Sequence, residues 1–343
     1  MRGDKCVEVV LPGKVEPEGL ELRSVPVPVP SAGQVVVGME ATGVSFAEQQ
    51  MRRGRYYDQP AFPFVPGYDL VGTVLAAGPG IGSELVGKRV AALTKTGGWA
   101  SHVVLDAADV VGVPDGVGAA EAETAVVNGI TAWQMLHRKA KVRSGATVLV
   151  HGANGGVGSV LVQLAIAAGA KVIGTASARH HEGLRALGVI PVDYRNENVP
   201  ARVRELAPGG VDAVFDHIGG RSVHDSWGLL ARGGTLVSYG SAATRDDEGS
   251  GSLPVFKLLG RVWLWNWLPN CRSAYFYNVW AGRAYAKDRF RARLRADLTQ
   301  VFAALDRGDL TPRIAAEIPL ARAAEAMRLA ESGTVAGKVV LVP

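Results

Sequence analysis

Cysteine is scarce in this chain, which has only two in 343 residues, Cys6 and Cys271. They lie far apart in the sequence, and neither belongs to a Cys-x-x-Cys pair. This spacing supports neither a disulfide framework nor a zinc site built from cysteines. We therefore expect a protein of a reducing compartment, the cytoplasm.

Long apolar runs and a large excess of one charge are also missing. No apolar run reaches the roughly 20 residues of a membrane-spanning helix, and no signal core follows the N-terminal residues. The net charge of +5 suits an anionic ligand but is too small to indicate nucleic-acid binding. In the densest basic stretch, Arg283–Arg295, the arginines alternate with apolar residues at helical spacing. That pattern favours a solvated helix face and no nucleic-acid partner.

A glycine-rich turn is the most informative feature that the sequence does contain. An apolar strand pattern at Val148–Val150 precedes it, and an apolar helix pattern at Val160–Ala168 follows it. A strand, a glycine turn and a helix N-terminus together direct free backbone N–H groups at a phosphate. The fingerprint of a dinucleotide site is matched by Ala153, Asn154, Gly155, Gly156, Val157 and Gly158, with Ala153 in place of the first glycine. We expect these six residues to bind the cofactor.

Further strand patterns follow the turn, in alternation with helical stretches. They lie at Ala170–Ala176, Val189–Tyr194, Val211–Asp216 and Gly234–Gly240. Such alternation predicts an α/β fold with a doubly wound parallel sheet.

The end of the second strand indicates which nicotinamide cofactor is used. An NAD site places an acid there, but this chain has no acid until Glu182. Ser177 can donate a hydrogen bond to a 2′-phosphate and Arg179 can pair with it, so we expect NADPH. Alternatively, Arg179 and the two histidines after it are the solvated start of a helix.

The length of the chain predicts a second domain. Short strand patterns broken by turn residues, typical of an all-β domain, precede the glycine turn at Gln34–Met39, Leu70–Leu75, Arg89–Leu93 and Ser101–Leu105. The last residues, Gly337–Pro343, again form a strand pattern that could return to this first domain. The parallel-sheet domain would then be an insertion.

An aromatic stretch at Leu253–Tyr277 has three possible roles. It contains Trp263, Trp265, Trp267, Tyr275, Phe276 and Tyr277. These side chains could line a substrate cleft, form a strand between subunits, or touch a membrane interface. We favour the first two roles, although Lys257 and Arg261 permit a peripheral amphipathic helix.

Three segments resemble one known family. They are Gly43–Glu48 with Met51–Tyr56, then Phe64–Gly72, then Asn128–Trp133. With the glycine turn and the Gly-Lys-Val-Val-Leu ending, they look like the zinc-independent NADPH:quinone oxidoreductases and enoyl reductases of the medium-chain dehydrogenase/reductase superfamily. The resemblance implies a GroES-like β domain of residues 1–126 and 286–343, and a Rossmann NADPH-binding domain of residues 127–285. It also implies a homodimer, with an edge strand near Tyr275–Tyr277 extending the sheet.

The same resemblance predicts that no metal is bound. Zinc alcohol dehydrogenases of the superfamily carry a cysteine and a histidine where this chain has Ser45 and Tyr68. Hydroxyl side chains are not usual zinc ligands. What remains is hydride transfer from NADPH to a quinone or to an activated carbon–carbon double bond of an enone or enoyl substrate.

The resemblance assigns candidate site residues one position at a time. For catalysis it points to Tyr56 and Tyr68, as hydrogen-bond or proton donors, and to Ser45, where relatives have an asparagine near the nicotinamide. Each tyrosine could instead pack with its hydroxyl on a backbone group. The further cofactor-binding positions are Asn128, Thr131, Tyr194, His217, Ile218, Gly219, Ser238, Tyr239 and Gly240.

Two alternative functions remain open. One is a membrane- or partner-associated binding protein of the same fold with weak or vestigial reductase activity, which the aromatic stretch would support. The other is a separate enoyl reductase that serves polyketide or other secondary metabolism.

Overall fold

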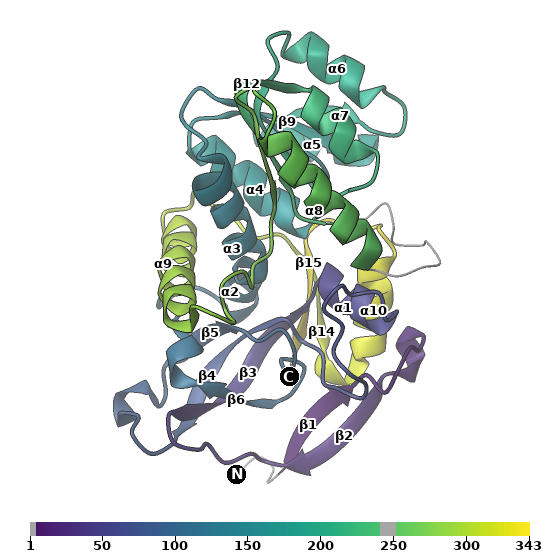
Figure 1. The fold of residues 1–343 in the computed structure, drawn as a ribbon. Helices are drawn as coiled ribbons and strands as arrows, with labels where there is room; N and C mark the ends of the chain where they lie inside the picture. The colour runs from purple at the N-terminus through teal and green to yellow at the C-terminus, as the bar shows by residue number, and fades with distance from the viewer. Residues whose placement is uncertain (1–4, 241–251) are drawn as a thin grey trace. The chain divides into compact units, whose positions relative to one another are not determined.

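The computed structural model describes residues 5–240 and 252–343 (Figure 1). The chain divides into two compact units. Unit 1 comprises Met1–Ile130, Gly282–Gly308 and Pro312–Pro343, and unit 2 comprises Thr131–Ala281 with Asp309–Thr311. We describe each unit by itself.

Unit 2 is built on a parallel sheet, which has six strands in the described part of the chain. The strands are β8 (Thr147–Val150), β9 (Lys171–Ala176), β10 (Ile190–Asp193), β11 (Val211–Asp216), β12 (Leu230–Ser238) and β13 (Ser273–Phe276). Their order is β10-β9-β8-β11-β12-β13, and each neighbouring pair is parallel. The strand order reverses between β8 and β11, the place where doubly wound sheets bind their ligands. The predicted α/β doubly wound fold is confirmed.

Helices pack against this sheet through buried apolar side chains. The helices are α4 (Gly156–Ala167), α5 (His181–Ala186), α6 (Val199–Leu206), α7 (Ser222–Gly228) and α8 (Ser252–Asn266). Val203 of α6, Val223 of α7 and Trp265 of α8 share one apolar core with strand residues such as Leu149 and Leu236. Helix α4 packs against β8 and β9. A π-helix, η4 (Gln134–Ala140), precedes β8 and contacts β12.

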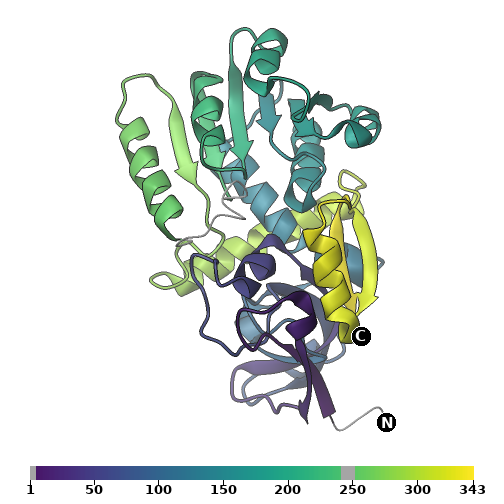
Figure 2. The same ribbon diagram turned by 90° about the vertical axis from the view of Figure 1, so that its right-hand side faces the viewer.

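The aromatic stretch forms a helix and an edge strand. Helix α8 runs beside β13, and both are drawn in green in Figure 2. Among the described residues β13 pairs only with β12, so it is an edge of the sheet, and it covers part of the segment predicted near Tyr275–Tyr277. Whether a second subunit adds to this edge remains a prediction.

Unit 1 is mainly antiparallel. Strands β1 (Lys5–Val10) and β2 (Glu21–Pro26) form a ribbon. The larger sheet contains β3 (Gln34–Val44), β4 (Asp69–Ala77), β5 (Arg89–Leu93), β6 (His102–Asp106), β7 (Val111–Gly112), β14 (Ile314–Pro319) and β15 (Lys338–Val342). Its helices are α1 (Phe46–Arg52), α2 (Ala119–Ala125), α9 (Lys287–Asp306) and α10 (Ala323–Glu331).

The last strand closes the sheet of unit 1. β15 pairs in parallel with β14 and antiparallel with β3, where Val340 faces Gly43. The predicted return of the C-terminal strand to the first β domain is therefore confirmed. In residues 5–240 and 252–343, no helix is both long and apolar enough to span a bilayer.

Candidate functional site

The glycine turn of unit 2 has the backbone geometry of a phosphate-binding loop. It connects β8 to α4, and Gly155 is the N-cap of that helix. Gly152 has a φ of +63°, a conformation that side chains disfavour. A Cβ on Gly158 would lie 2.1 Å from the carbonyl oxygen of Gly152, so only glycine lets the helix begin this close to the turn. Free N–H groups at this helix start are suited to bind a pyrophosphate.

Ala153 fits the turn in place of the first fingerprint glycine. It is fully buried, and its backbone N–H donates a 3.0 Å hydrogen bond to the carbonyl of Thr175 on β9. Its methyl group lies against Gly174, where an added Cβ would be only 2.7 Å away. A glycine on the neighbouring strand thus makes room for the alanine.

A buried carboxylate orders the loop after β11. Asp216 accepts hydrogen bonds through Oδ1 from the backbone N–H groups of Ile218 (2.8 Å) and Gly219 (3.0 Å). Its Oδ2 accepts from the hydroxyls of Ser222 and Ser226, both at 2.8 Å. These bonds fix the backbone of residues 217–219, which the resemblance assigned to the cofactor.

The same carboxylate is connected to the glycine turn by a chain of hydrogen bonds. Ser226 gives its hydroxyl hydrogen to Asp216, so Nε2–H of His151 donates to the Ser226 oxygen at 3.1 Å. Nδ1 of His151 then accepts from Thr175 at 3.4 Å, and Thr175 Oγ1 accepts from the N–H of Gly152 at 3.1 Å. Burial lowers the pKa of His151, which keeps it neutral as this chain requires.

Three predicted cofactor residues lie together at the ends of β11 and β12. His217, Tyr239 and Gly240 follow these strands, and the His217 and Tyr239 rings lie 5.9 Å apart. His217 Nδ1 and the hydroxyl of Ser238, the last residue of β12, are buried and find no hydrogen-bond partner among the described residues. Burial lowers the pKa of His217 and raises that of Tyr239.

Ser177 and Arg179, predicted to bind the 2′-phosphate, follow β9, and the predicted cofactor residue Tyr194 follows the neighbouring strand β10. Ser177 is buried, whereas Arg179 is exposed and donates through Nε to His180 at 3.0 Å. Tyr194 is half exposed beside the guanidinium of Arg195. No carboxylate intervenes between Ser177 and Arg179 in the chain.

In unit 1, Tyr56 and Tyr68 form a hydroxyl pair. Their oxygens lie 2.7 Å apart, and their rings meet edge to face at 6.3 Å. Burial, followed by the neighbouring tyrosines, raises the pKa of Tyr56, so its hydroxyl keeps its proton. The pair is a source of hydrogen bonds for an anionic or carbonyl oxygen.

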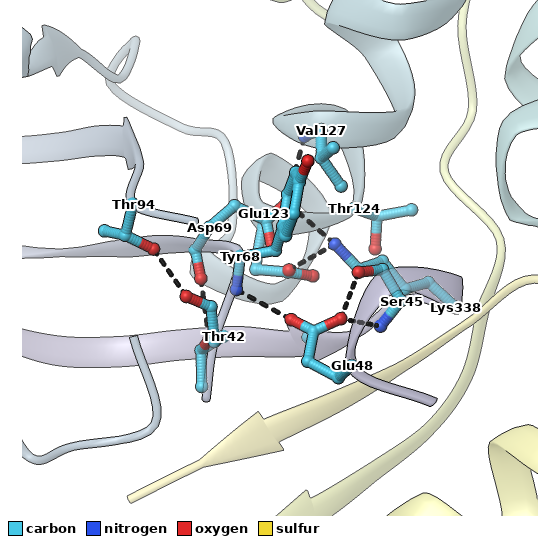
Figure 3. Close-up of polar contacts among 12 residues, drawn as sticks. Thr42, Ser45, Glu48, Tyr68, Asp69, Thr94, Glu123, Thr124, Val127 and Lys338 are labelled. Atoms are coloured by element: carbon cyan, nitrogen blue, oxygen red, sulfur yellow. Dashed lines mark hydrogen bonds and ion pairs between the residues drawn. The ribbon is translucent and has the colours of Figure 1, made fainter. Parts of the chain in front are cut away.

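The third predicted catalytic residue, Ser45, uses its side chain to cap its own helix. It precedes α1, and its hydroxyl donates to Oε2 of Glu48, which also accepts from the Ser45 backbone N–H at 3.0 Å. Oε1 of Glu48 accepts from the backbone N–H of Tyr68 at 2.7 Å. Glu48 therefore fixes both Ser45 and Tyr68 (Figure 3).

Sequence reasoning missed an ionic cluster beneath Tyr68. Lys338 lies 2.8 Å from Asp69 and 2.5 Å from Glu123, and all three side chains are buried (Figure 3). Burial, reinforced by the Asp69 charge, raises the pKa of Glu123 well above its usual range. Burial would lower the pKa of Lys338, but the two carboxyl groups outweigh it and raise the value. The sign of this cluster in the sequence was Lys338, a lysine in the otherwise apolar run at the C-terminus.

Asn128 and Thr131 both lie on helix α3 (Val127–Trp133) but belong to different units. Asn128 is buried in unit 1, and its Nδ2 has no hydrogen-bond partner within residues 5–240 and 252–343. Thr131 is buried in unit 2. Their common role in cofactor binding remains a prediction.

The residues at the expected zinc-ligand positions do not fit zinc. Ser45 donates to Glu48, and Tyr68 shares its hydroxyl hydrogen bond with Tyr56. Zinc is held by thiolate, imidazole and carboxylate groups, and the described residues contain no group of three or more such side chains that could hold a metal ion.

Comparison with family models matches both parts of the chain. The family described as zinc-binding dehydrogenase matches residues 186–341, and the alcohol dehydrogenase GroES-like domain matches residues 31–115. The predicted GroES-like domain is thereby confirmed.

Individual relatives match almost the whole chain. The synaptic vesicle membrane protein VAT-1 homolog of Mus musculus is 31% identical over 347 residues, covering 99% of this chain and 84% of the relative. Among solved structures, a quinone oxidoreductase of Pseudomonas syringae is 27% identical with a TM-score of 0.83, covering 98% of this chain and all of that one. A mycobacterial protein solved in complex with NADPH is 29% identical with a TM-score of 0.82, over the same shares.

Proposed function

The chain belongs to the quinone oxidoreductase, VAT-1 and enoyl reductase-like family of the medium-chain dehydrogenase/reductase superfamily, and from this membership we propose a zinc-independent, NADPH-dependent reductase. Members of this superfamily are NAD(P)H-dependent oxidoreductases. The proposed acceptor is a quinone or the activated double bond of an enone or enoyl compound.

The Tyr56–Tyr68 hydroxyl pair is the observation that carries this proposal. A quinone or enone gains negative charge on its oxygen as it accepts a hydride. A phenol that keeps its proton can hydrogen-bond that oxygen and stabilise the charge, as an oxyanion hole does. Tyr68 stands at a position where zinc alcohol dehydrogenases of the superfamily carry a metal ligand, and the two hydroxyls need no Lewis acid to stabilise this charge.

The glycine turn and the loop fixed by Asp216 fit a dinucleotide. Ser177 and Arg179 would take the 2′-phosphate, since no acid lies between them to repel it. When bound, the cofactor supplies the hydride. The protein's own contribution is to position both reactants and stabilise the acceptor oxygen.

The first experiment follows the loss of reduced-nicotinamide absorbance with chelator-treated protein. NADPH and NADH are each compared against ortho-quinones, para-quinones, α,β-unsaturated ketones and an enoyl thioester. Metal-independent turnover that prefers NADPH supports the proposal, and turnover with the thioester alone supports the enoyl reductase alternative. Absence of binding by either nucleotide would contradict both.

The Tyr56→Phe variant tests the role of the hydroxyl pair. We expect kcat to fall by about 10- to 100-fold, because one donor to the developing charge is lost, while the Kd for NADPH stays unchanged. Tyr285→Phe is the control, since Tyr285 is 87% exposed. An unchanged kcat in Tyr56→Phe would remove the pair from the mechanism.

Association with a membrane surface is a second candidate function, favoured by the outer face of α8. Leu259 and Trp263 lie four residues apart on this helix, and Trp267 directly follows its last residue, Asn266. These three residues are 41%, 64% and 73% exposed. Exposed tryptophan on a helix that also carries a cation, here Lys257, is typical of helices that lie in the lipid interface. The opposite face is held in the core by Trp265, which stacks on Trp227.

Co-sedimentation with vesicles tests this second function. Vesicles of phosphatidylcholine with and without phosphatidylserine are mixed with the protein at physiological salt. The double variant Trp263→Gln/Trp267→Gln should lose binding to the vesicles. The control variant Val29→Gln should still bind, because Val29 is 84% exposed but lies far from α8 in the sequence. Wild-type protein left wholly in the supernatant would contradict membrane association.

We also propose that β13 pairs with its equivalent in a second copy, giving a homodimer. An open strand edge is available for such pairing. Light scattering coupled to size-exclusion chromatography tests this proposal, and a monomeric mass at micromolar concentration would contradict it.

A further inference from the structure

Three tyrosines of unit 1, Tyr57, Tyr56 and Tyr68, contact one another in that order. The rings of Tyr57 and Tyr56 lie 4.7 Å apart at an angle of 48°, and those of Tyr56 and Tyr68 lie 6.3 Å apart at 87°. The hydroxyl of Tyr56 is 2.7 Å from that of Tyr68 and is also hydrogen-bonded to Tyr57. The three phenols therefore form a hydrogen-bonded chain with Tyr56 in the middle.

The two ends of this tyrosine chain differ in their access to water. Tyr57 is 36% exposed, whereas Tyr68 is only 5% exposed. Burial is the main cause that raises the pKa of both Tyr56 and Tyr57, so their hydroxyls carry protons at neutral pH. The tyrosine chain thus leads from the solvent to a buried phenol.

Backbone hydrogen bonds hold Tyr68, the inner end of the chain, on both sides. Its N–H donates to Oε1 of Glu48 at 2.7 Å. Its carbonyl oxygen accepts from the backbone N–H groups of Thr94 at 2.9 Å and of Lys95 at 3.2 Å. The position of the buried phenol is therefore fixed by two other segments of unit 1.

Lys95 also fixes the outer end of the chain. Its Nζ forms an ion pair with Asp58, the residue that follows Tyr57. Lys95 has a φ of +68°, a conformation that residues with a side chain disfavour. One residue thus ties the segment that carries Tyr57 to the turn that carries Tyr68, which keeps the two ends of the chain at a constant separation.

The proposed reduction needs a proton as well as a hydride. The oxygen of a quinone or enone becomes an anion when the acceptor takes the hydride, and it then gains a proton from a nearby acid. A buried phenol that gives up its proton must regain one before the next turnover. Because Tyr68 has so little contact with water, its proton has to come through other groups of the protein.

We infer that Tyr57 is the solvent end of a proton path that runs through Tyr56 to Tyr68. This inference rests on the proposed function and names the source of its proton. Tyr68 gives its proton to the acceptor oxygen and takes that of Tyr56, which takes that of Tyr57. Water then supplies Tyr57. Each phenol breaks one O–H bond and forms another, as a group that both donates and accepts can do, so one solvent proton reaches the acceptor and no electron moves along the path.

The Tyr57→Phe variant tests this path, because it keeps the ring and removes the outer hydroxyl. Turnover is measured with saturating NADPH and three acceptors: menadione, a para-quinone; methyl vinyl ketone, an enone; and crotonyl-CoA, an enoyl thioester. We expect kcat to fall about tenfold, while the KM of the acceptor and the Kd for NADPH stay unchanged. Tyr285→Phe, at an exposed position of unit 1, is the control and should keep the wild-type kcat.

Rescue by a small proton donor distinguishes a proton path from structural support. Tyr57→Ala leaves space for a buffer molecule where the phenol stood. Imidazolium buffer at rising concentration, with pH and ionic strength held constant, should raise the kcat of Tyr57→Ala at least about threefold. The kcat of wild-type protein should not depend on the buffer concentration, because its path is complete.

The other outcomes overturn the inference. An unchanged kcat in Tyr57→Phe would remove Tyr57 from proton transfer. A fall in kcat that imidazolium does not restore in Tyr57→Ala would make the side chain a support of its loop, and a rise in KM alone would make it a contact of the acceptor. If wild-type protein reduces none of the three acceptors, the proposed function itself fails and the inference falls with it. That result is seen without any variant, so it is distinct from a selective failure of the path.

Discussion

At the scale of single residues, the protonation state of His151 determines whether the loops around the glycine turn stay connected. Neutral His151 donates to Ser226 and accepts from Thr175, which in turn accepts from the N–H of Gly152. A protonated imidazole has no lone pair to accept from Thr175. Protonation would therefore break the chain between Asp216 and the turn.

This arrangement predicts acid sensitivity of folding. Burial lowers the pKa values of His151 and His217 below 6.5. The negative charge of Asp216 partly opposes this lowering at both histidines, and the charge of Asp225 does so at His151. Below pH 6.5 the unfolded chain then binds more protons than the folded one. The free energy of unfolding should fall by up to about 1.4 kcal/mol per pH unit for each histidine as the pH falls from 6.5 toward the folded-state pKa.

Thermal unfolding between pH 8 and pH 5 measures this effect. His151→Asn removes one of the two buried titrations and should make the Tm fall less steeply below pH 6.5. His102→Asn is the control on unit 1, because the side chain of His102 is only half-buried. Parallel curves for wild type and His151→Asn would show that His151 does not determine the acid sensitivity.

At the scale of elements, the sequence predicted the glycine turn and its strands well. β11 begins and ends where the predicted strand pattern does, because five of its six residues are buried and only Asp212 is exposed. Helix α4 begins at Gly156, before the predicted apolar pattern at Val160, because the fingerprint glycines form its first turn. Helix α8 was ambiguous because its aromatic residues lie on both a buried and an exposed face.

Two glycines of the turn provide a matched test. A Cβ at Gly158 would meet the backbone oxygen of Gly152 at 2.1 Å, whereas a Cβ at Gly155 would meet the same oxygen at 3.3 Å. Gly158→Ala should therefore move the helix away from β8, weaken NADPH binding at least about tenfold and lower the Tm. Gly155→Ala should change both far less. The reverse order of effects in calorimetry and thermal unfolding would contradict the geometry.

At the scale of the whole molecule, a buried ionic cluster joins distant parts of unit 1. Asp69 begins β4, Glu123 lies on α2 and Lys338 begins β15. The lysine and Asp69 are 269 positions apart in the sequence. No local pattern links them, so sequence reasoning recovered the returning strand from its apolar residues but not the ion pairs that fix it.

Lys338→Met should destabilise unit 1 strongly. It leaves Asp69 without its buried cation, and breaking a buried pair in this way typically costs about 3–5 kcal/mol. Lys171→Met, at an exposed lysine that begins β9, serves as the control. Urea unfolding measures the free energy of unfolding of both variants. Equal values would mean that the cluster does not hold β15 in the sheet.

The position of β15 also has a consequence for biosynthesis. This strand lies between β14 and β3, so the sheet of unit 1 has a gap until the last residues arrive. The ribosome makes all of unit 2 before it makes β15. Domains generally fold as units during synthesis, in the order in which they emerge. Unit 2 can therefore fold first on the nascent chain, while the edge of β3 that later pairs with β15 stays unpaired and prone to aggregation.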